Sequence, residues 1–248
     1  MEWIYLSPHL DDIALSCGGL VWEQAINGER AAIWSICAGD PPDVPLSSFA
    51  NSLHQRWKTG SDSTEERRRE DAQSCAYLTA THRHFLVPDC IYRRSPQDGH
   101  PLYDSEEAIF GPLDSVELPL VEEVCTHLEQ IIPEGAILVS PLAIGGHVDH
   151  RLAREAAERL GKSLWYYADY PYVERPGAEI NPLLPTAYEK VVFKVSEKGM
   201  QAWFDSVAAH RSQISTFWPD LQSMQVALEA YYAKHGGVRL WKPVSSNS

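Results

Sequence analysis

Two short apolar runs with a helical segment between them lie within the first 37 residues of the chain. Residues 3–6 (WIYL) and 31–37 (AAIWSIC) are rich in aromatic and β-branched side chains, which favour buried strands. Residues 18–25 (GGLVWEQA) between them are typical of a helix, and Asn27-Gly28 is a typical helix end. A strand–helix–strand unit of this length joins parallel strands by a right-handed crossover, so the segment predicts a parallel sheet.

The rest of the chain repeats this alternation and predicts one α/β domain over residues 1–248. Further strands are expected at residues 84–87, 136–140, 164–167 and 191–195. Helices are expected at residues 63–80, 118–132 and 151–160 and again up to about residue 234, with a polar tail at 245–248. Two turn-rich stretches, residues 39–62 and 93–115, are expected to be surface excursions that cover a pocket, the first of them ending in a short helix.

The composition excludes several classes of protein. A net charge of −13 over 248 residues argues against binding nucleic acid or an anionic membrane, for which Lys and Arg must dominate one face. The five cysteines are scattered without a C-x-x-C pair, so we expect reduced thiols and no disulfide framework. No run of 18 apolar residues occurs. The sequence therefore predicts a cytoplasmic protein without a membrane span.

Histidine and aspartate side chains follow two of the predicted strands. SPHLDD at residues 7–12 comes directly after the first strand, and HVDH at residues 147–150 follows the strand at 136–140 by several residues. Ligands bind outside the carboxyl ends of parallel strands, so we expect the two clusters to meet at one edge of the sheet. A single cluster of this kind is more often a helix cap, because aspartate stabilises a helix N-terminus. Two clusters on the same edge favour a metal site.

The residue types in the two clusters fit a catalytic zinc site. His9 and Asp12 lie three residues apart in a strand-to-helix turn, close enough to reach one ion, and His150 supplies a third ligand. Two imidazoles and one carboxylate leave the fourth position of Zn²⁺ open for water, whose pKa then falls towards about 7. A structural zinc site, in contrast, has protein ligands at all four positions.

The other ionisable residues of the clusters suit catalysis. Asp11 is not needed as a ligand and suits a general base that accepts the proton of the water. We expect His147, protonated and held by Asp149, to point into the same space and stabilise an oxyanion. Asp149 lies between His147 and His150 in the sequence, and so it suits the orientation of either imidazole through its second nitrogen.

The motif SPHLDD, followed by a glycine pair at residues 18–19, and the motif HVDH resemble the two signatures of the LmbE/PIG-L-like zinc-dependent N-acetylglucosaminyl deacetylases. The resemblance spans at least residues 3–172. It implies a Rossmann-like fold of three layers, α/β/α, in which a mostly parallel sheet has helices on both faces, and one Zn²⁺ per chain. The roles that it implies are zinc ligation by His9, Asp12 and His150, general base catalysis by Asp11 and oxyanion stabilisation by His147.

A weaker resemblance selects four candidates for substrate binding. Arg67 matches the spacing of an R-x-x-E segment whose arginine binds the polar head of the substrate in some relatives, and Arg68 is the alternative. Both arginines equally suit a solvated helix face. Asp89 resembles a strand-end aspartate that holds sugar hydroxyls in relatives, and is otherwise a turn residue. Tyr170 belongs to an aromatic segment, residues 166–172, that resembles the mouth of such sites, although core packing explains part of this segment equally well.

The chain departs from the family pattern at two positions. Some relatives have a tyrosine two residues before the first histidine of the second motif, where it is proposed to assist the tetrahedral intermediate. Gly145 stands at that position, so this help must come from His147 or from a tyrosine elsewhere. Leu10 stands where proline is common. Neither change affects a predicted zinc ligand.

The sequence thus predicts a zinc-dependent amidase that removes an acyl group, foremost acetyl, from the nitrogen of an amino sugar or its conjugate. A zinc-site hydratase or lyase is one alternative, because a fold does not fix a reaction. A Rossmann-like module that only binds a small molecule is another, although the first strand-to-helix turn lacks the G-x-G-x-x-G pattern. Members of the family often assemble into trimers or hexamers, and the resemblance extends that expectation to this chain.

Overall fold

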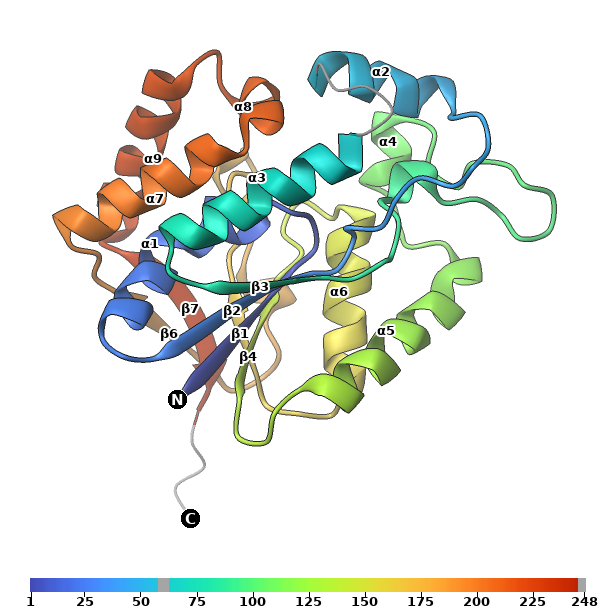
Figure 1. Ribbon diagram of the computed structural model, residues 1–248. Helices are drawn as coiled ribbons and strands as arrows, with labels where there is room; N and C mark the ends of the chain where they lie inside the picture. The colour runs from blue at the N-terminus through green and yellow to red at the C-terminus, as the bar shows by residue number, and fades with distance from the viewer. Residues whose placement is uncertain (58–62, 245–248) are drawn as a thin grey trace.

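A seven-stranded sheet forms the centre of the computed structural model, which describes residues 1–57 and 63–244 (Figure 1). Its strands lie in the order β3 (Thr81–His84), β2 (Arg30–Ser35), β1 (Glu2–Ser7), β4 (Ile137–Pro141), β5 (Leu164–Tyr167), β7 (Val238–Pro243) and β6 (Tyr188–Phe193). The strands from β3 to β5 are parallel, and β7 is antiparallel to both of its neighbours. The prediction of a mostly parallel sheet is therefore confirmed.

Helices cover both faces of the sheet, which confirms the predicted α/β/α layers. One face carries α1 (Asp12–Ile26), α3 (Ser63–Tyr77), α7 (Glu197–Ala209) and α9 (Leu221–His235). The other face carries α5 (Leu118–Ile131) and α6 (Val148–Arg159). Three shorter helices, α2 (Ser48–Trp57), α4 (Glu106–Ile109) and α8 (Arg211–Phe217), lie at the top of Figure 1, beyond the carboxyl ends of the parallel strands.

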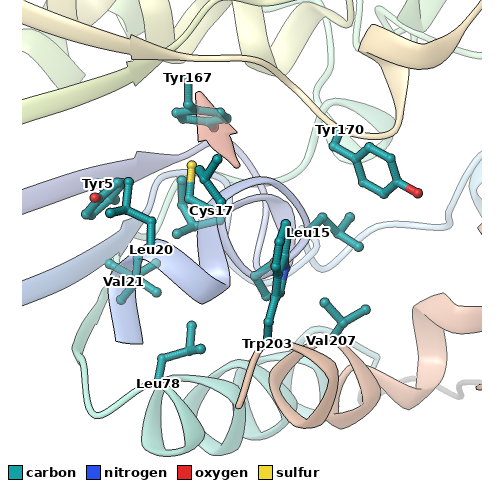
Figure 2. Packing of buried hydrophobic residues seen from close by; sticks show 14 of the residues in the cluster. Tyr5, Leu15, Cys17, Leu20, Val21, Leu78, Tyr167, Tyr170, Trp203 and Val207 are labelled. Carbon is teal, nitrogen blue, oxygen red and sulfur yellow. The ribbon is translucent and has the colours of Figure 1, made fainter. Parts of the chain in front are cut away.

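Side chains of β1 alternate between the two cores. Trp3 and Tyr5 pack with α1, α3, α7 and α9, whereas Ile4 and Leu6 pack with α5 and α6. This follows from the strand itself, because successive side chains point to opposite faces. Figure 2 shows the first core, in which side chains of α1 lie between the sheet and Trp203 of α7. Burial on both faces explains why β1 is an uninterrupted apolar run.

The sequence predicts a helix that begins at residue 18, but helix α1 begins at Asp12. Gly18 and Gly19 lie inside the helix, where they allow α7 to approach closely. A Cβ added at Gly18 would lie 2.7 Å from Cδ1 of Trp203, and one at Gly19 would lie 2.9 Å from Cε3 of the same ring. The glycine pair thus marks a helix–helix contact and not a helix start. The earlier start places both aspartates of the first motif at the N-terminus of α1.

Two strands differ from the prediction. β3 ends at His84, where the predicted strand at residues 84–87 begins. Its side chains are mostly exposed at the edge of the sheet, so no apolar pattern marks it. β7 follows α9 after Gly236 and Gly237, whereas the sequence pattern predicts only helices before the tail. Arg239 and Lys242 interrupt its apolar residues, so the sequence pattern does not reveal this strand. In the sheet, β7 is inserted between β5 and β6.

The two predicted excursions extend over the carboxyl edge of the sheet. The first contains α2, the short helix expected there, and the second contains α4. Residues of both excursions join Val148 of α6 in a third apolar cluster. Part of the first excursion, residues 58–62, and the predicted tail at 245–248 lie outside the described residues. Across the described ranges, no helix has the length and apolar character needed to cross a bilayer.

Candidate metal centre and active site

The two histidine–aspartate clusters meet at the carboxyl edge of the sheet, as predicted. β1 and β4 are adjacent parallel strands, and their pairing runs from Trp3 with Ile137 to Tyr5 with Val139. The chain after β1 leads through α1 to β2 on one side, whereas β4 is followed by β5 on the other side. The order of the strands therefore reverses between β1 and β4, and such a switch point leaves space for a ligand.

Asp12 lies between the two imidazoles that are predicted to share a metal ion with it. Its Oδ2 is 3.3 Å from Nδ1 of His9, and its Oδ1 is 3.4 Å from Nε2 of His150. Oδ2 also accepts a 2.7 Å hydrogen bond from the backbone N–H of His9, which fixes the carboxylate. The ring centroids of the two histidines are 5.3 Å apart. Asp12 therefore contacts both histidines through different oxygens, whereas His9, His147 and His150 form the group whose donor atoms all lie within 4.8 Å of one another.

His150 has the nitrogen atom that best indicates a metal. Its Nε2 is buried and has no hydrogen-bond partner in the part of the chain that the structure describes. Nδ1 of the same ring hydrogen-bonds Oδ1 of Asp169 at 2.6 Å, which keeps the proton on Nδ1 and leaves the Nε2 lone pair facing Asp12. Zinc-bound histidines usually have a carboxylate on the second nitrogen in this way. The donor set of His9, Asp12 and His150 fits Zn²⁺.

The carboxylates around these imidazoles favour positive charge at the centre. Burial disfavours a charge on His150, but Asp12 and Asp169 raise its pKa to about 9. Burial also disfavours a charge on Asp12, yet His150 and His9 hold the pKa of this carboxyl well below its usual range. A site that stabilises protonated imidazoles so strongly also stabilises a divalent cation in place of the protons.

The side chain of Asp11 lines the pocket. It does not cap helix α1, which is the alternative interpretation of the first motif. The residue occupies the N-cap position of α1, but its side chain accepts no capping hydrogen bond. Its Oδ1 is 3.9 Å from Nη2 of Arg67. Burial and the neighbouring Asp12 raise the pKa of Asp11. A raised pKa is what a carboxylate needs to accept a proton near neutral pH.

The carboxylate of Asp149 orients His9. The sequence predicts instead that it orients His147 or His150. Its Oδ2 is 2.9 Å from Nε2 of His9, and its Oδ1 forms an ion pair with Arg93. The prediction considers only sequence neighbours, whereas the first turn of α6 directs this carboxylate across the site to the other motif. The contact leaves Nδ1 of His9, which faces Asp12, as the nitrogen available to a metal.

His147 is neutral, which corrects the prediction of a protonated side chain held by the Asp149 carboxylate. Its Nδ1 accepts a 3.2 Å hydrogen bond from the backbone N–H of Asp149, at the N-cap of α6. Burial and the nearby His9 lower the pKa of His147 well below its usual range. The ring proton therefore lies on Nε2. The residue lines the pocket and can donate one hydrogen bond there without carrying a charge.

Three buried charged residues support the site and lie outside the two motifs. Asp169 follows β5, so the rule that a carboxylate after a parallel strand belongs to the site could have found it. Arg93 joins Asp149 to Glu117, with 3.2 Å between Nη2 and the Glu117 Oε2, and Glu117 also accepts a 2.6 Å hydrogen bond from the Tyr103 hydroxyl. The sequence gives no signal for Arg93 or Glu117, because loop folding alone brings them together.

A cavity of about 240 Å³ opens above the candidate metal centre. Its floor is polar and is lined by His9, Asp11, Asp12, Arg67, Asp89 and His147. Its walls carry aromatic and apolar side chains, Trp57, Ile109, Phe110, Tyr172 and Phe217 among them, and also polar ones such as Arg56, Glu106 and Arg175. The wall residues come from α2, α4, α8 and the segment after β5. The two excursions therefore cover the pocket, as the sequence predicts.

Arg67 and Asp89, two of the four predicted substrate-binding residues, lie on the floor of this pocket. Nη1 of Arg67 is 3.5 Å from Oδ2 of Asp89, and the same guanidinium lies near Asp11. Arg68 points away from the pocket and donates a 2.8 Å hydrogen bond to Oδ1 of Asp40. Of the two arginines that the sequence leaves open, Arg67 is therefore the one beside the site.

Tyr170 lies in the apolar core and not at the pocket mouth, contrary to the prediction. Its ring packs against Tyr231 with 4.5 Å between the centroids, and Figure 2 shows it among the core side chains. The pocket residue of this aromatic segment is Tyr172, whose ring centroid is 5.5 Å from that of His150. A Cβ added at Gly145 would lie 3.0 Å from Cβ of Tyr172. Tyr172 thus fills the space beside the position where the family tyrosine is absent.

The part of the chain that contains both motifs is similar to known proteins. Residues 4–160 match the family described as PIG-L, GlcNAc-PI de-N-acetylase, and this range includes both histidine–aspartate motifs. A 2'-N-acetylparomamine deacetylase of Niallia circulans is 30% identical over 190 residues, which are 68% of this chain and 67% of the relative. A protein of Streptomyces fradiae with the same description is 30% identical over 217 residues, or 79% of this chain and 69% of the relative.

A solved structure is similar along its whole length. The zinc-inhibited form of teicoplanin deacetylase Orf2 matches with a TM-score of 0.85 and 28% sequence identity, covering 100% of both chains. The similarity therefore extends beyond residue 160 to the antiparallel strands β6 and β7, which complete the sheet.

Proposed function

The chain belongs to the PIG-L family and is a zinc-dependent N-deacetylase, and from this premise we propose which of its residues carry out the reaction. His9, Asp12 and His150 hold one zinc ion, Asp11 is the general base, and His147 stabilises the oxyanion. The buried, unpartnered Nε2 of His150, 3.4 Å from Asp12 at the floor of the pocket, is the observation that carries this assignment.

The substrate that we propose is an amino sugar, or a conjugate of one, that carries an N-acetyl group. The family description names GlcNAc-PI, the two curated relatives are named for 2'-N-acetylparomamine, and the structural neighbour is named for teicoplanin. The pocket supports a sugar substrate, because Arg67 and Asp89 offer a hydrogen-bond donor and acceptor side by side on its floor. Such groups match the hydroxyls of a sugar ring.

Asp11 moves the proton in the proposed reaction. Zinc in a site of this kind polarises the amide carbonyl and allows water to attack at neutral pH. Asp11 accepts a proton from the attacking water and then returns it to the nitrogen of the leaving amine. Burial and the charge of Asp12 raise the pKa of Asp11, and the charge of Arg67 opposes only part of this rise, so the carboxylate is more basic than an ordinary aspartate.

His147 and Tyr172 offer hydrogen bonds to the negative charge that develops on the carbonyl oxygen. The backbone N–H of Asp149 occupies Nδ1 of His147, so the proton on Nε2 is directed elsewhere and serves as the donor. Burial and the carboxylate of Asp12 raise the pKa of Tyr172, which keeps its phenol protonated. Tyr172 therefore suits the role that a tyrosine at the Gly145 position has in some relatives.

Three further properties concern the whole chain: its domain organisation, its cellular location and its oligomeric state. We propose that residues 1–248 form one catalytic domain, that the enzyme works in the cytoplasm and that it assembles into trimers or hexamers as family members often do. Size-exclusion chromatography with light scattering measures the last property directly.

Elemental analysis of protein purified without added metal or chelator tests the assignment of the ligands. We expect about one zinc per chain in the wild type and its loss in His150→Ala, because this substitution removes one of three protein ligands. His84→Ala is the matched control, since His84 is paired with Asp71 away from the pocket. Release of acetate from N-acetylglucosamine should fall together with the zinc content. Full zinc content in His150→Ala, or no zinc in the wild type after zinc is offered, would contradict the assignment.

A further inference from the structure

Arg175 lies over two aromatic rings that line the pocket. It follows the short 3-10 helix η3 (Tyr172–Glu174), and its guanidinium carbon lies 4.5 Å from the ring centroid of Tyr172 and 5.0 Å from that of Phe110. The two rings contact each other edge to face, with 5.8 Å between their centroids. The side chain is exposed and lines the pocket. Cation–π contacts with the two rings therefore hold a positive charge at the pocket.

The same two rings contact the proposed catalytic centre. The ring centroid of Phe110 is 5.4 Å from that of His147, and the ring centroid of Tyr172 is 5.5 Å from that of His150. Arg175 is thus separated from the proposed metal ligand and oxyanion donor by one layer of aromatic rings. His147 and Arg175 line the same cavity, so both can contact one sugar that is bound there.

Arg175 differs from the other arginines of the pocket because it lacks a carboxylate partner. Arg67 lies 3.5 Å from Asp89, and Arg56 lies 3.2 Å from Glu106. Within residues 1–57 and 63–244, no carboxylate oxygen lies within 4.0 Å of the Arg175 guanidinium. Of the three arginines that line the pocket, Arg175 is therefore the one whose charge is not already met by a carboxylate of the described residues, which leaves it available to a ligand.

Among the described residues the Arg175 guanidinium donates no hydrogen bond, so its N–H groups are available to a ligand. These donors form a fork that fits phosphate or carboxylate oxygens. We propose that Arg175 binds an anionic substituent, a phosphate or a carboxylate, on the N-acetylated amino sugar. This inference rests on the proposed function and narrows the substrate to acidic amino sugars or their conjugates.

Sugars that differ only in the anionic group test this inference. The probes are N-acetylglucosamine, its 1-phosphate, its 6-phosphate and N-acetylmuramic acid, which together separate phosphate from carboxylate. We expect the wild type to have a higher kcat/KM for at least one anionic probe than for N-acetylglucosamine. Arg175→Gln should reduce this preference by about tenfold to 100-fold, the range for hydrogen bonds between charged groups. Arg175→Lys, which keeps the charge but loses the fork, should give a smaller reduction.

Arg56→Gln is the matched control, because the charge of Arg56 already faces Glu106. It should change kcat/KM for neutral and anionic probes by the same factor. Binding is measured separately by calorimetry in zinc-loaded Asp11→Asn protein, with and without Arg175→Gln, so that the probes are not turned over. The ratio of Kd values for neutral and anionic probes should show the same dependence on Arg175.

The outcomes separate this inference from the proposed function. No preference for any anionic probe, or equal effects of Arg175→Gln on neutral and anionic probes in both assays, would overturn the role of Arg175. Hydrolysis of N-acetylglucosamine by the wild type would still support the proposed function in that case. If no probe is hydrolysed but the binding preference depends on Arg175, the proposed reaction fails while anion recognition by Arg175 stands.

Discussion

Asp11 and Asp12 are adjacent carboxylates whose surroundings give them opposite properties. Both are buried at the N-terminus of α1. Asp12 lies between two imidazoles, and their positive charge holds its pKa well below the usual range despite burial. Asp11 is subject to burial and to the charge of Asp12, and its pKa is raised. Titratable neighbours whose pKa values are pushed apart in this way commonly divide the acid–base work of an active site.

Asp11→Asn should therefore lower kcat by about 100-fold to 10,000-fold, the usual contribution of a positioned general base. The amide side chain has the same shape but does not accept the proton of water. Zinc should stay bound, because no proposed ligand is changed. Acetate release at saturating substrate and elemental analysis of the same sample measure the two effects. In the control Asp12→Asn, zinc should be lost. Wild-type turnover in Asp11→Asn would remove the base from the mechanism, and zinc loss there would place Asp11 among the ligands.

Sequence alone identifies the residues of the two motifs, because each motif lies next to a strand that burial makes recognisable. It does not identify their partners. Asp149 and His9 are 140 residues apart in the sequence, yet the Asp149 carboxylate contacts His9 across the site. Arg93 and Glu117 meet only after the second excursion has folded. Tyr170 and Tyr172 are two residues apart in one aromatic segment, and only tertiary packing sends the first to the core and the second to the pocket.

At the scale of elements, the contact between α1 and α7 sets the position of the two aspartates of the first motif. Gly18 lies against the ring of Trp203, which is fully buried and donates a 2.7 Å hydrogen bond from Nε1 to the carbonyl oxygen of Ala14. The ring is therefore held in place on the helix whose first turn contains Asp12. Any change that separates the two helices also moves the start of α1.

Gly18→Ala should destabilise the protein, although alanine favours a helix over glycine by about 1 kcal/mol. The new Cβ would lie 2.7 Å from Cδ1 of Trp203, closer than such atoms pack, and overfilling a core costs about 1–3 kcal/mol. Urea unfolding measures the difference in free energy. In a Trp203→Leu background the smaller side chain should remove most of the penalty, so the two substitutions should be strongly non-additive. A Gly18→Ala protein that is more stable than the wild type would show that α7 moves away from the new Cβ with little loss of free energy.

The elements that sequence predicts well are the strands buried on both sides, β1, β2 and β4, and helices with one buried face, such as α5. Their positions differ from the prediction by a residue or two, because continuous apolar runs and helical periodicity mark them. β3 is largely exposed at the edge of the sheet and has no such mark. β7 is inserted between β5 and β6 from the far end of the chain, an arrangement that no local pattern encodes.

At the scale of the whole molecule, the fold buries several ionisable groups whose protonation in acid differs between the native and the unfolded chain. His210, between α7 and α8, is one that lies outside the proposed catalytic residues. It is 2% exposed, and its Nε2 has no hydrogen-bond partner among the described parts of the chain. Burial lowers the pKa of His210 from 6.5 to about 4, because the charges of Asp71 and Asp12 offset only part of the loss of water. The native state therefore keeps this imidazole neutral.

This burial should make the stability of the protein fall as the pH falls from about 6.5 to about 4. In that window the unfolded chain binds a proton at His210 and the native state does not, so acid favours the unfolded chain. Above pH 6.5 both states are neutral there and the contribution is constant. The shift of about 2.5 pH units corresponds to at most about 3 kcal/mol, of which about 2 kcal/mol is lost by pH 5.

Unfolding in urea at pH 7.5 and at pH 5 measures this loss in the wild type and in His210→Gln. Other titrating groups, including those of the metal centre, contribute equally to both proteins, so the difference between the two pH dependences isolates His210. The glutamine variant does not titrate and should lose about 2 kcal/mol less between the two pH values. Equal losses in both proteins would mean that His210 gains a proton in the native state as readily as in the unfolded chain, and that the space around it opens to water before the fold gives way.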